Sequence, residues 1–150
     1  MTVTRANIET TLVARASALM AYVSMAITVV GTNADLADPI SFGILECGES
    51  VADITNPTTA EVAACANPYK LLALAEFRLL ENIAGNLAKV DTTLGPRSER
   101  LSQLAALLEA RMKRLSDMLK TKYGIGAAVL TAGYIDYNIA SHSDSVSEDE

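Results

Sequence analysis

The stretch from Asn67 to Val90, NPYKLLALAEFRLLENIAGNLAKV, decides the fold of this chain. Asn67-Pro68 predicts the start of a helix, because asparagine can cap the first turn and proline is tolerated at the first helical position. The apolar residues that follow cover a wide arc of this helix. They are Leu71, Leu72, Leu74, Leu79, Leu80, Ile83, Leu87 and Val90. So wide an arc predicts that the helix is buried on more than one side.

A second long helix is expected to begin at Pro96, after a connection at 92–95. Its apolar residues advance by about 3.6 positions on average, as one face of an α-helix requires. They are Leu101, Leu104, Leu108, Met112, Leu115 and Leu119. Gly124 predicts the end, because glycine adopts the left-handed C-terminal cap readily. The two helices predict an antiparallel αα-hairpin, with Leu80, Ile83, Leu104 and Leu108 among its core residues.

Shorter helices are expected on the N-terminal side of this hairpin. Thr4 or Asn7 can cap a first helix, whose apolar stripe continues through Val23 and Ile27 toward the breaker cluster at 31–33. Asp38-Pro39 predicts a short helix that ends at Gly48.

One more short helix is predicted by Thr58 and Glu61, which have the spacing of a capping box. The composition agrees with a helical fold. Half of the 150 residues are apolar, mean hydropathy is +0.23 and tryptophan is absent, so the apolar mass comes mainly from aliphatic side chains. The expected fold is therefore mainly α, a helical bundle built on a long hairpin.

The pattern changes after Gly126, where apolar residues alternate with a period of two. One face of the alternation holds Val129, Thr131, Gly133, Ile135, Tyr137 and Ile139, and the other holds Leu130, Ala132, Tyr134, Asp136 and Asn138. Such a pattern predicts an extended arm that needs a partner, because a single strand cannot satisfy its own main-chain hydrogen bonds. We therefore divide the chain into a helical domain at 1–126 and an extended arm with an acidic tail at 127–150.

Charge is unevenly distributed along the chain. The net charge is −6, but the segment from Arg97 to Lys122 alone carries +4 and leaves −10 for the remainder. A basic helix on an acidic body indicates either a solvated face or a surface that complements an acidic neighbour, including another copy of the chain. On the second interpretation, Arg97, Arg111 and Arg114 are expected to contribute to contacts between subunits.

No pattern in the sequence points to catalysis. The only histidine, His142, lies in the polar tail without a nucleophile or a fixed carboxylate near it in sequence. Glu76 and Glu81 are five apart, which separates them by more than about 100° around a helix. Phosphate-binding loops and metal-ligand spacings are absent from the sequence. We expect a protein that is not an enzyme and takes no cofactor.

Two further features bear on the environment of the protein. Cys47 and Cys65 have no metal-site or redox spacing, so they can be two buried thiols or a disulfide. The uncharged segment at 16–30 is shorter than the roughly 20 apolar residues that a membrane span needs, and it lacks the features of a signal peptide. We expect no association with a membrane.

Seven stretches of the sequence carry a resemblance to a known family. They are the run LAEFRLLENIAGN at 74–86, Val90-Asp91, GPRSE at 95–99, LSQL at 101–104 and YGIG at 123–126, together with TVTRA at 2–6 and DLADP at 35–39. These stretches resemble the head-to-tail connector, or adaptor, proteins of tailed bacteriophages. The resemblance covers most of residues 1–126 and contains no catalytic signature.

The resemblance implies a structural protein of the virion neck that is assembled in the host cytoplasm. Such a connector forms a ring of twelve copies beneath the portal, extends the DNA channel and joins the capsid to the next connector or tail protein. Genomic DNA passes through without specific binding, and an acidic wall suits that passage. The arm at 127–140 is expected to dock onto the portal, with Tyr134, Ile135, Tyr137 and Ile139 as anchors.

Two alternatives remain open at the level of sequence. The first is a small helical module for packaging or regulation that binds nucleic acid through the basic helix. No aromatic residues interleave its basic ones, which disfavours this interpretation. The second is another part of the virion, such as a stopper or tail-completion protein.

Overall fold

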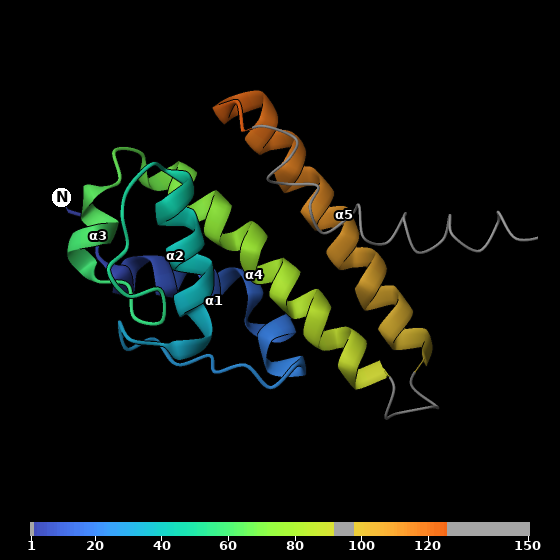
Figure 1. Cartoon of the computed structure of the whole chain (residues 1–150). Helices are drawn as coiled ribbons and strands as arrows, with labels where there is room; N and C mark the ends of the chain where they lie inside the picture. Colours follow the sequence, from blue (N-terminus) through green and yellow to red (C-terminus); the bar gives the residue numbers. More distant parts are fainter. Residues whose placement is uncertain (1, 92–97, 126–150) are drawn as a thin grey trace, which may run out of the picture.

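The computed structural model describes residues 2–91 and 98–125, and within these ranges the chain is a bundle of helices without any strand. The elements are α1 (Arg5–Tyr22), the 3-10 turn η1 (Ala34–Leu36), α2 (Ala37–Glu46), α3 (Thr59–Ala64), α4 (Pro68–Asp91) and α5 (Ser98–Tyr123). Helix α4 lies between α5 and the pair formed by α1 and α2 (Figure 1). The prediction of a mainly α fold is confirmed.

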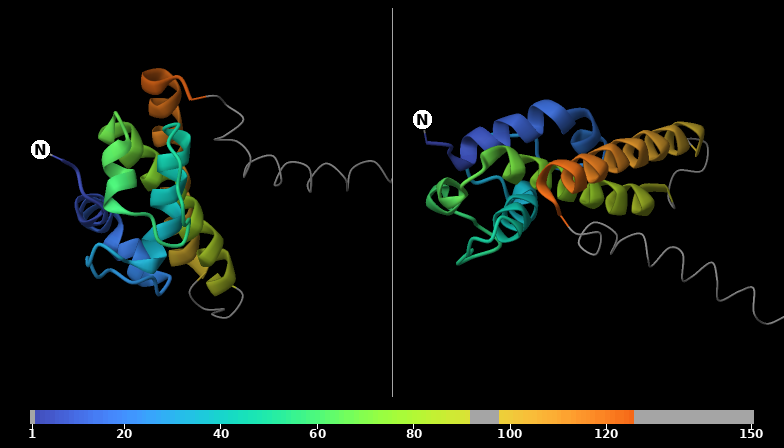
Figure 2. Two further views of the ribbon diagram at one scale, coloured as in Figure 1. Left: turned by 60° about the vertical axis from the view of Figure 1, so that its left-hand side comes forward. Right: turned by 90° about the horizontal axis from the view of Figure 1, so that it is seen from above.

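Helices α4 and α5 run side by side in opposite directions in Figures 1 and 2, as an αα-hairpin requires. Of the four core residues expected at their interface, Leu80, Ile83 and Leu108 are buried. Leu104 is half-buried and packs against the same cluster. The connection at 92–97 lies outside the described residues, as do Arg97 and the arm at 127–150.

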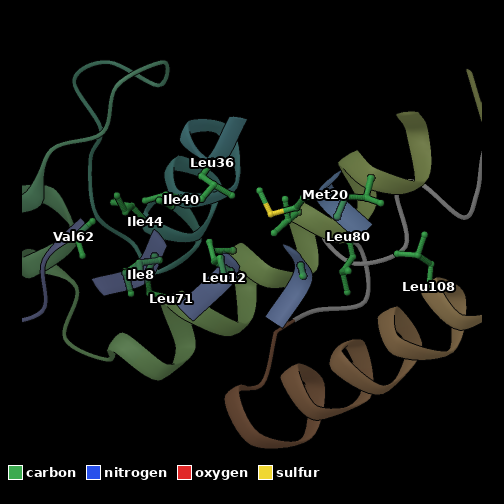
Figure 3. Close-up of a cluster of buried hydrophobic side chains, with 14 of the residues drawn as sticks. Ile8, Leu12, Met20, Leu36, Ile40, Ile44, Val62, Leu71, Leu80 and Leu108 are labelled. Atoms are coloured by element: carbon green, nitrogen blue, oxygen red, sulfur yellow. The ribbon is translucent and has the colours of Figure 1, made fainter. Parts of the chain in front are cut away.

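The main core lies where α1, α2 and α4 meet. Figure 3 shows Leu12 and Met20 of α1 near Leu36 and Ile40, with Leu71 of α4 below them. All five side chains are completely buried. Because α4 contributes side chains both to this core and to its contact with α5, it is buried on two sides, as its wide apolar arc predicts.

A glycine allows α2 to approach α4 closely. A β-carbon at Gly43 would lie 2.7 Å from the Leu71 side chain and 2.9 Å from the Leu71 carbonyl oxygen. Side chains can move, but the main chain of α4 cannot move without disturbing its helical hydrogen bonds. The absence of a side chain at Gly43 therefore sets how close the two helices lie.

The helix starts confirm most of the sequence signals. Thr4 and Asn7 form a reciprocal capping box on α1, and Thr58 and Glu61 form another on α3. The Asn67 side chain accepts from the main-chain N–H groups of Tyr69 and Lys70, which caps α4. These bonds satisfy N–H groups that have no partner inside the helix.

Helix α1 ends nine residues earlier than the breaker cluster at 31–33 suggests, at Tyr22. Ser24 has a φ of 61°, a left-handed conformation that no helix can continue through. The prediction that Val23 and Ile27 continue the helical stripe is wrong for Ile27, which is 47% exposed. The hydrogen bonds of the residues that follow, described below, hold the main chain in a non-helical path, although the apolar residues keep their helical spacing.

The start of α2 also differs from the sequence expectation. Asp38 does not cap the helix; it lies inside the first turn, because η1 leads directly into α2 at Ala37. Asn33 caps this composite element by accepting from Asp35 N–H at 2.9 Å. The expected end is observed, since α2 stops at Glu46 and Gly48 has a φ of 89°. Likewise Gly124, with a φ of 64°, follows the last residue of α5.

Candidate interaction surface

A buried polar cluster ties both long connections of the N-terminal half to α1. Arg5 and Glu9 are one helical turn apart and almost completely buried, with Arg5 Nε donating to Glu9 Oε1 at 3.0 Å. The Arg5 guanidinium also donates to Asn56 Oδ1 and to the carbonyl oxygens of Pro57 and Asn33. Sequence reasoning missed this cluster, although arginine and glutamate four apart on an expected apolar stripe were a signal for it.

Glu9 and Asn33 determine the path of the connection after α1. Glu9 accepts from the N–H groups of Gly31 and Asn33 at 2.7 and 3.0 Å. The Asn33 side-chain amide donates to the carbonyl oxygens of Ala26 and Thr28, both at 2.9 Å. Residues 23–33 are therefore held along the body, where Figure 1 shows them as an open blue trace below the helices.

A second ionic cluster joins α1, α4 and α5. Glu76 of α4 is buried and accepts from Arg15 of α1 at 2.6 Å and from Arg111 of α5 at 2.7 Å. Arg111 also donates to the Arg15 carbonyl oxygen at 3.0 Å. Arg111 was expected at a contact between subunits, but its bonds to Glu76 and Arg15 tie it to its own chain, where it fixes α5 against the body.

The outward face of α5 is basic. Lys113, Arg114 and Lys120 are exposed, and Asp117 lies among them. Their spacing places them on the side of α5 opposite the buried Leu108 and Leu119. The expected contribution of the exposed Arg114 to contacts between subunits stays a prediction. This set of three basic residues is called the α5 basic face below.

Acidic side chains gather on α2, on α3 and on the connection between them. The end of α2, its connection to α3 and the start of α3 carry Glu46, Glu49, Asp53 and Glu61. Figure 1 shows these elements at the left and α5 at the right. These four carboxylates are called the α2–α3 acidic face below.

Local hydrogen bonds favour the charged form of two of these carboxylates. The pKa of Asp53 is lowered by hydrogen bonds from the hydroxyl and N–H groups of Thr55. The pKa of Glu61 is lowered by the N–H of Ala52 and by the N–H and hydroxyl of Thr58. The α2–α3 acidic face therefore keeps these negative charges below the ordinary titration range of carboxylates.

Arg78 connects α4 to α2. Its Nε donates to Asp38 at 2.9 Å, and its Nη1 lies 3.4 Å from Glu81. Asn82 donates to the same Asp38 oxygen at 2.8 Å. The Arg78 guanidinium also lies 5.5 Å from the centre of the Phe42 ring. Arg78 and Glu81 thus stabilise a packing contact, and Glu76 belongs to the separate cluster with Arg15 and Arg111.

Cys47 and Cys65 are both free thiols. The sequence left open two buried thiols or a disulfide, and the structure has two thiols. Burial is the largest cause that raises the pKa of each, and the pKa of Cys65 is raised to about 11. A thiol that remains protonated is a poor nucleophile.

The described residues contain no cluster of three or more His, Cys, Asp or Glu side chains that could hold a metal ion. In the same part of the chain, no helix is long and apolar enough to cross a membrane. The predicted anchors Tyr134, Ile135, Tyr137 and Ile139 lie outside the described residues. The sequence and structure match no protein-family model, no curated protein and no solved structure.

Proposed function

We propose that this chain is a structural virion protein, a head-to-tail connector whose copies form a ring beneath the portal and extend the DNA channel. The observation that carries the proposal is the placement of two complementary surfaces. The α5 basic face belongs to α5, at the right of Figure 1, and the α2–α3 acidic face belongs to the elements at the left. Different, complementary patches on separate elements suit head-to-tail association, which gives a ring when the rotation between copies closes.

The internal ion pairs support this use of α5. Arg15 and Arg111 converge on Glu76 and hold the helix against α1 and α4. The α5 basic face is thereby presented on a braced helix, so little conformational entropy is lost when it meets a partner. Exposed charges of this kind steer association and select the partner more than they add affinity.

The experiment is a charge exchange between the two faces. A variant with Lys113→Glu and Arg114→Glu should sediment as a smaller species than the unmodified chain. A second variant, with Glu49→Lys and Asp53→Lys, should behave alike, and a mixture of the two should recover the large species. Thr10→Lys and Thr11→Lys on α1 provide a control outside both faces.

The same proteins distinguish assembly of the ring from its attachment to the portal. The unmodified ring should bind purified portal protein, and the smaller species of the two variants should bind it weakly. If the unmodified chain remains a monomer at high concentration and binds no portal, the proposal of a connector is wrong. Attachment through the arm anchors Tyr134, Ile135, Tyr137 and Ile139 stays a prediction.

The second candidate is a module that binds nucleic acid, because Lys113, Arg114 and Lys120 are exposed on one face. Asp117 lies among them, and the acidic remainder of the chain repels phosphate. DNA binding that weakens steeply with salt and is lost in the Lys113→Glu and Arg114→Glu variant would favour this candidate over the connector.

A further inference from the structure

The connection after α1 exposes a short stretch with the composition of a β-strand. Ala26, Ile27, Thr28, Val29 and Val30 are all exposed, and no helix, strand or turn includes residues 25–29. Ile27 is 47% exposed and Val30 is 60% exposed. β-Branched residues favour extended backbone and gain from pairing with another strand. Residues 26–30 are called the exposed edge below.

The main chain of the exposed edge is bound along one side only. Ala26 donates its N–H to Asp35 and accepts at its carbonyl from Asn33, and the Thr28 carbonyl accepts from the same Asn33 amide. In extended backbone, residues i and i+2 direct their N–H and C=O groups to one side and residue i+1 directs them to the other.

On an extended path, Ile27 and Val29 would direct their main-chain groups away from Asn33. Within the described ranges 2–91 and 98–125, no hydrogen bond reaches the N–H or C=O of either residue. These donors and acceptors are open, and the Glu9 and Asn33 contacts hold the segment in place. Such an edge is a template for an added strand.

The occupant that fits this edge is present in the sequence. Residues 127–140, AAVLTAGYIDYNIA, alternate with period two and carry a single charge, Asp136. The connection at 23–33 carries no charge at all. Because the two segments hold a single charge between them, pairing would rest on main-chain hydrogen bonds and apolar side chains, as in β-strand addition.

The positions of the two ends favour a second copy over the same molecule. The last turn of α5, from which the arm departs, is at the top of Figure 1, and the connection at 23–33 is at the bottom. The left view of Figure 2 keeps this separation. To reach its own edge, the arm would have to cross the body from the top to the bottom of this view.

An arm of 14 residues extends about 46 to 50 Å at most, so crossing the body would consume part of this length before pairing began. A neighbouring copy avoids this cost. We propose that the exposed edge of each chain accepts the alternating arm of a second copy as an added β-strand. Such a contact is head-to-tail, because two different segments meet.

This pairing adds to the proposed function, because it is the contact that the arm would make between subunits of the ring. It rests on the connector proposal only for the place of the ring in the virion. A second copy replaces the portal as the first partner of the arm. Binding of the arm to the portal instead is one outcome of the test.

Two single-cysteine chains provide the test. Both carry Cys47→Ala and Cys65→Ala, one with Val29→Cys and the other with Ile135→Cys. Mixed at equal amounts and oxidised with glutathione disulfide, they should yield a disulfide heterodimer about tenfold faster than the control pair Thr10→Cys and Ile135→Cys, because docking raises the local thiol concentration.

Other outcomes would overturn the proposal. A chain that carries both Val29→Cys and Ile135→Cys and closes only an internal disulfide, with no heterodimer from the mixture, assigns the edge to its own arm. Equal rates for the test and control pairs show that the arm does not dock here. If rings still form in that case, the connector proposal survives, and protection of the arm by added portal protein would then give the portal as its partner.

A proline pair tests the main-chain bonds themselves. On an extended path, Val29→Pro removes an N–H on the outward side, whereas Val30→Pro removes one on the side of the body; Val29 is 38% exposed and Val30 is 60% exposed. Each substitution is introduced into the chain that lacks both native cysteines, with Ile27→Cys as the reporter. Val29→Pro should slow crosslinking to Ile135→Cys several-fold more than Val30→Pro does. Equal effects would exclude strand addition.

Discussion

Arg111 Nη2 lies 2.7 Å from Glu76 Oε1, while Arg15 binds the other oxygen of the same carboxylate at 2.6 Å. One buried carboxylate thus connects three helices that are distant in sequence. The Arg15 and Arg111 side chains are 47% and 28% exposed, so solvent partly screens them, but Glu76 itself is buried. The positive charge of Arg111, which in the sequence suggests a surface for a partner, therefore stabilises the packing of α5 against its own chain.

Replacement of Glu76 by glutamine should lower the free energy of unfolding by about 1 to 3 kcal/mol, because the shape is kept but two charge-assisted hydrogen bonds are weakened. Urea unfolding followed by circular dichroism measures the change. Arg114→Gln, on the exposed side of α5, is the matched control and should change stability by less than about 0.5 kcal/mol. Equal effects of the two substitutions would contradict the role given to Glu76.

The buried pair of Arg5 and Glu9 should be more sensitive. Glu9→Gln removes the charge that compensates Arg5 in a site from which water is excluded, so we expect a loss of about 3 to 5 kcal/mol. The same change weakens two hydrogen bonds that hold Gly31 and Asn33. Hydrogen exchange should therefore show earlier opening of residues 23–33 than of α4. A cost below about 1 kcal/mol would refute this account.

The long helices and their caps could be predicted from the sequence because their determinants are local. Asn67-Pro68, the Thr58 to Glu61 spacing and Gly124 each act within a few residues. The end of α1 could not be predicted in this way. Ile27 continues the helical spacing of apolar residues, but Glu9 and Asn33 bind the main chain after Tyr22 and hold it outside the helix. The bond of Arg111 to Glu76 could not be predicted for a similar reason, since the two residues are 35 positions apart.

Two leucines of α5 should respond differently to truncation. Leu108 is buried, so Leu108→Ala should cost about 2 to 5 kcal/mol through lost transfer free energy and the cavity left behind. Leu104 is only half-buried, so Leu104→Ala should cost about 1 to 2 kcal/mol. Thermal and urea unfolding of both variants give the comparison. A larger loss at Leu104 than at Leu108 would show that the packing of α5 is misplaced.

The buried thiol of Cys65 should react slowly with alkylating agents at pH 8, because burial raises its pKa to about 11. Mass spectrometry after iodoacetamide treatment should show a rate that increases with pH up to about that value. The neutral thiol is favoured by the fold, so its contribution to stability is complete below the ordinary pKa of 9.0 and is lost as the pH approaches 11. Fast labelling at pH 8 in the folded protein would contradict this prediction.

Truncation after Gly126 should separate folding from assembly. The buried core of the described chain contains no residue beyond Leu119, so the shortened chain should retain its helical circular dichroism and its unfolding midpoint. It should sediment as a monomer, because the arm that would add to the exposed edge of a neighbour is gone. A matched chain that lacks only residues 141–150 removes the acidic tail but keeps the alternating arm, and should assemble normally. Assembly of the shorter chain, or loss of its helical signal, would show respectively that the charged faces suffice or that the arm belongs to the core.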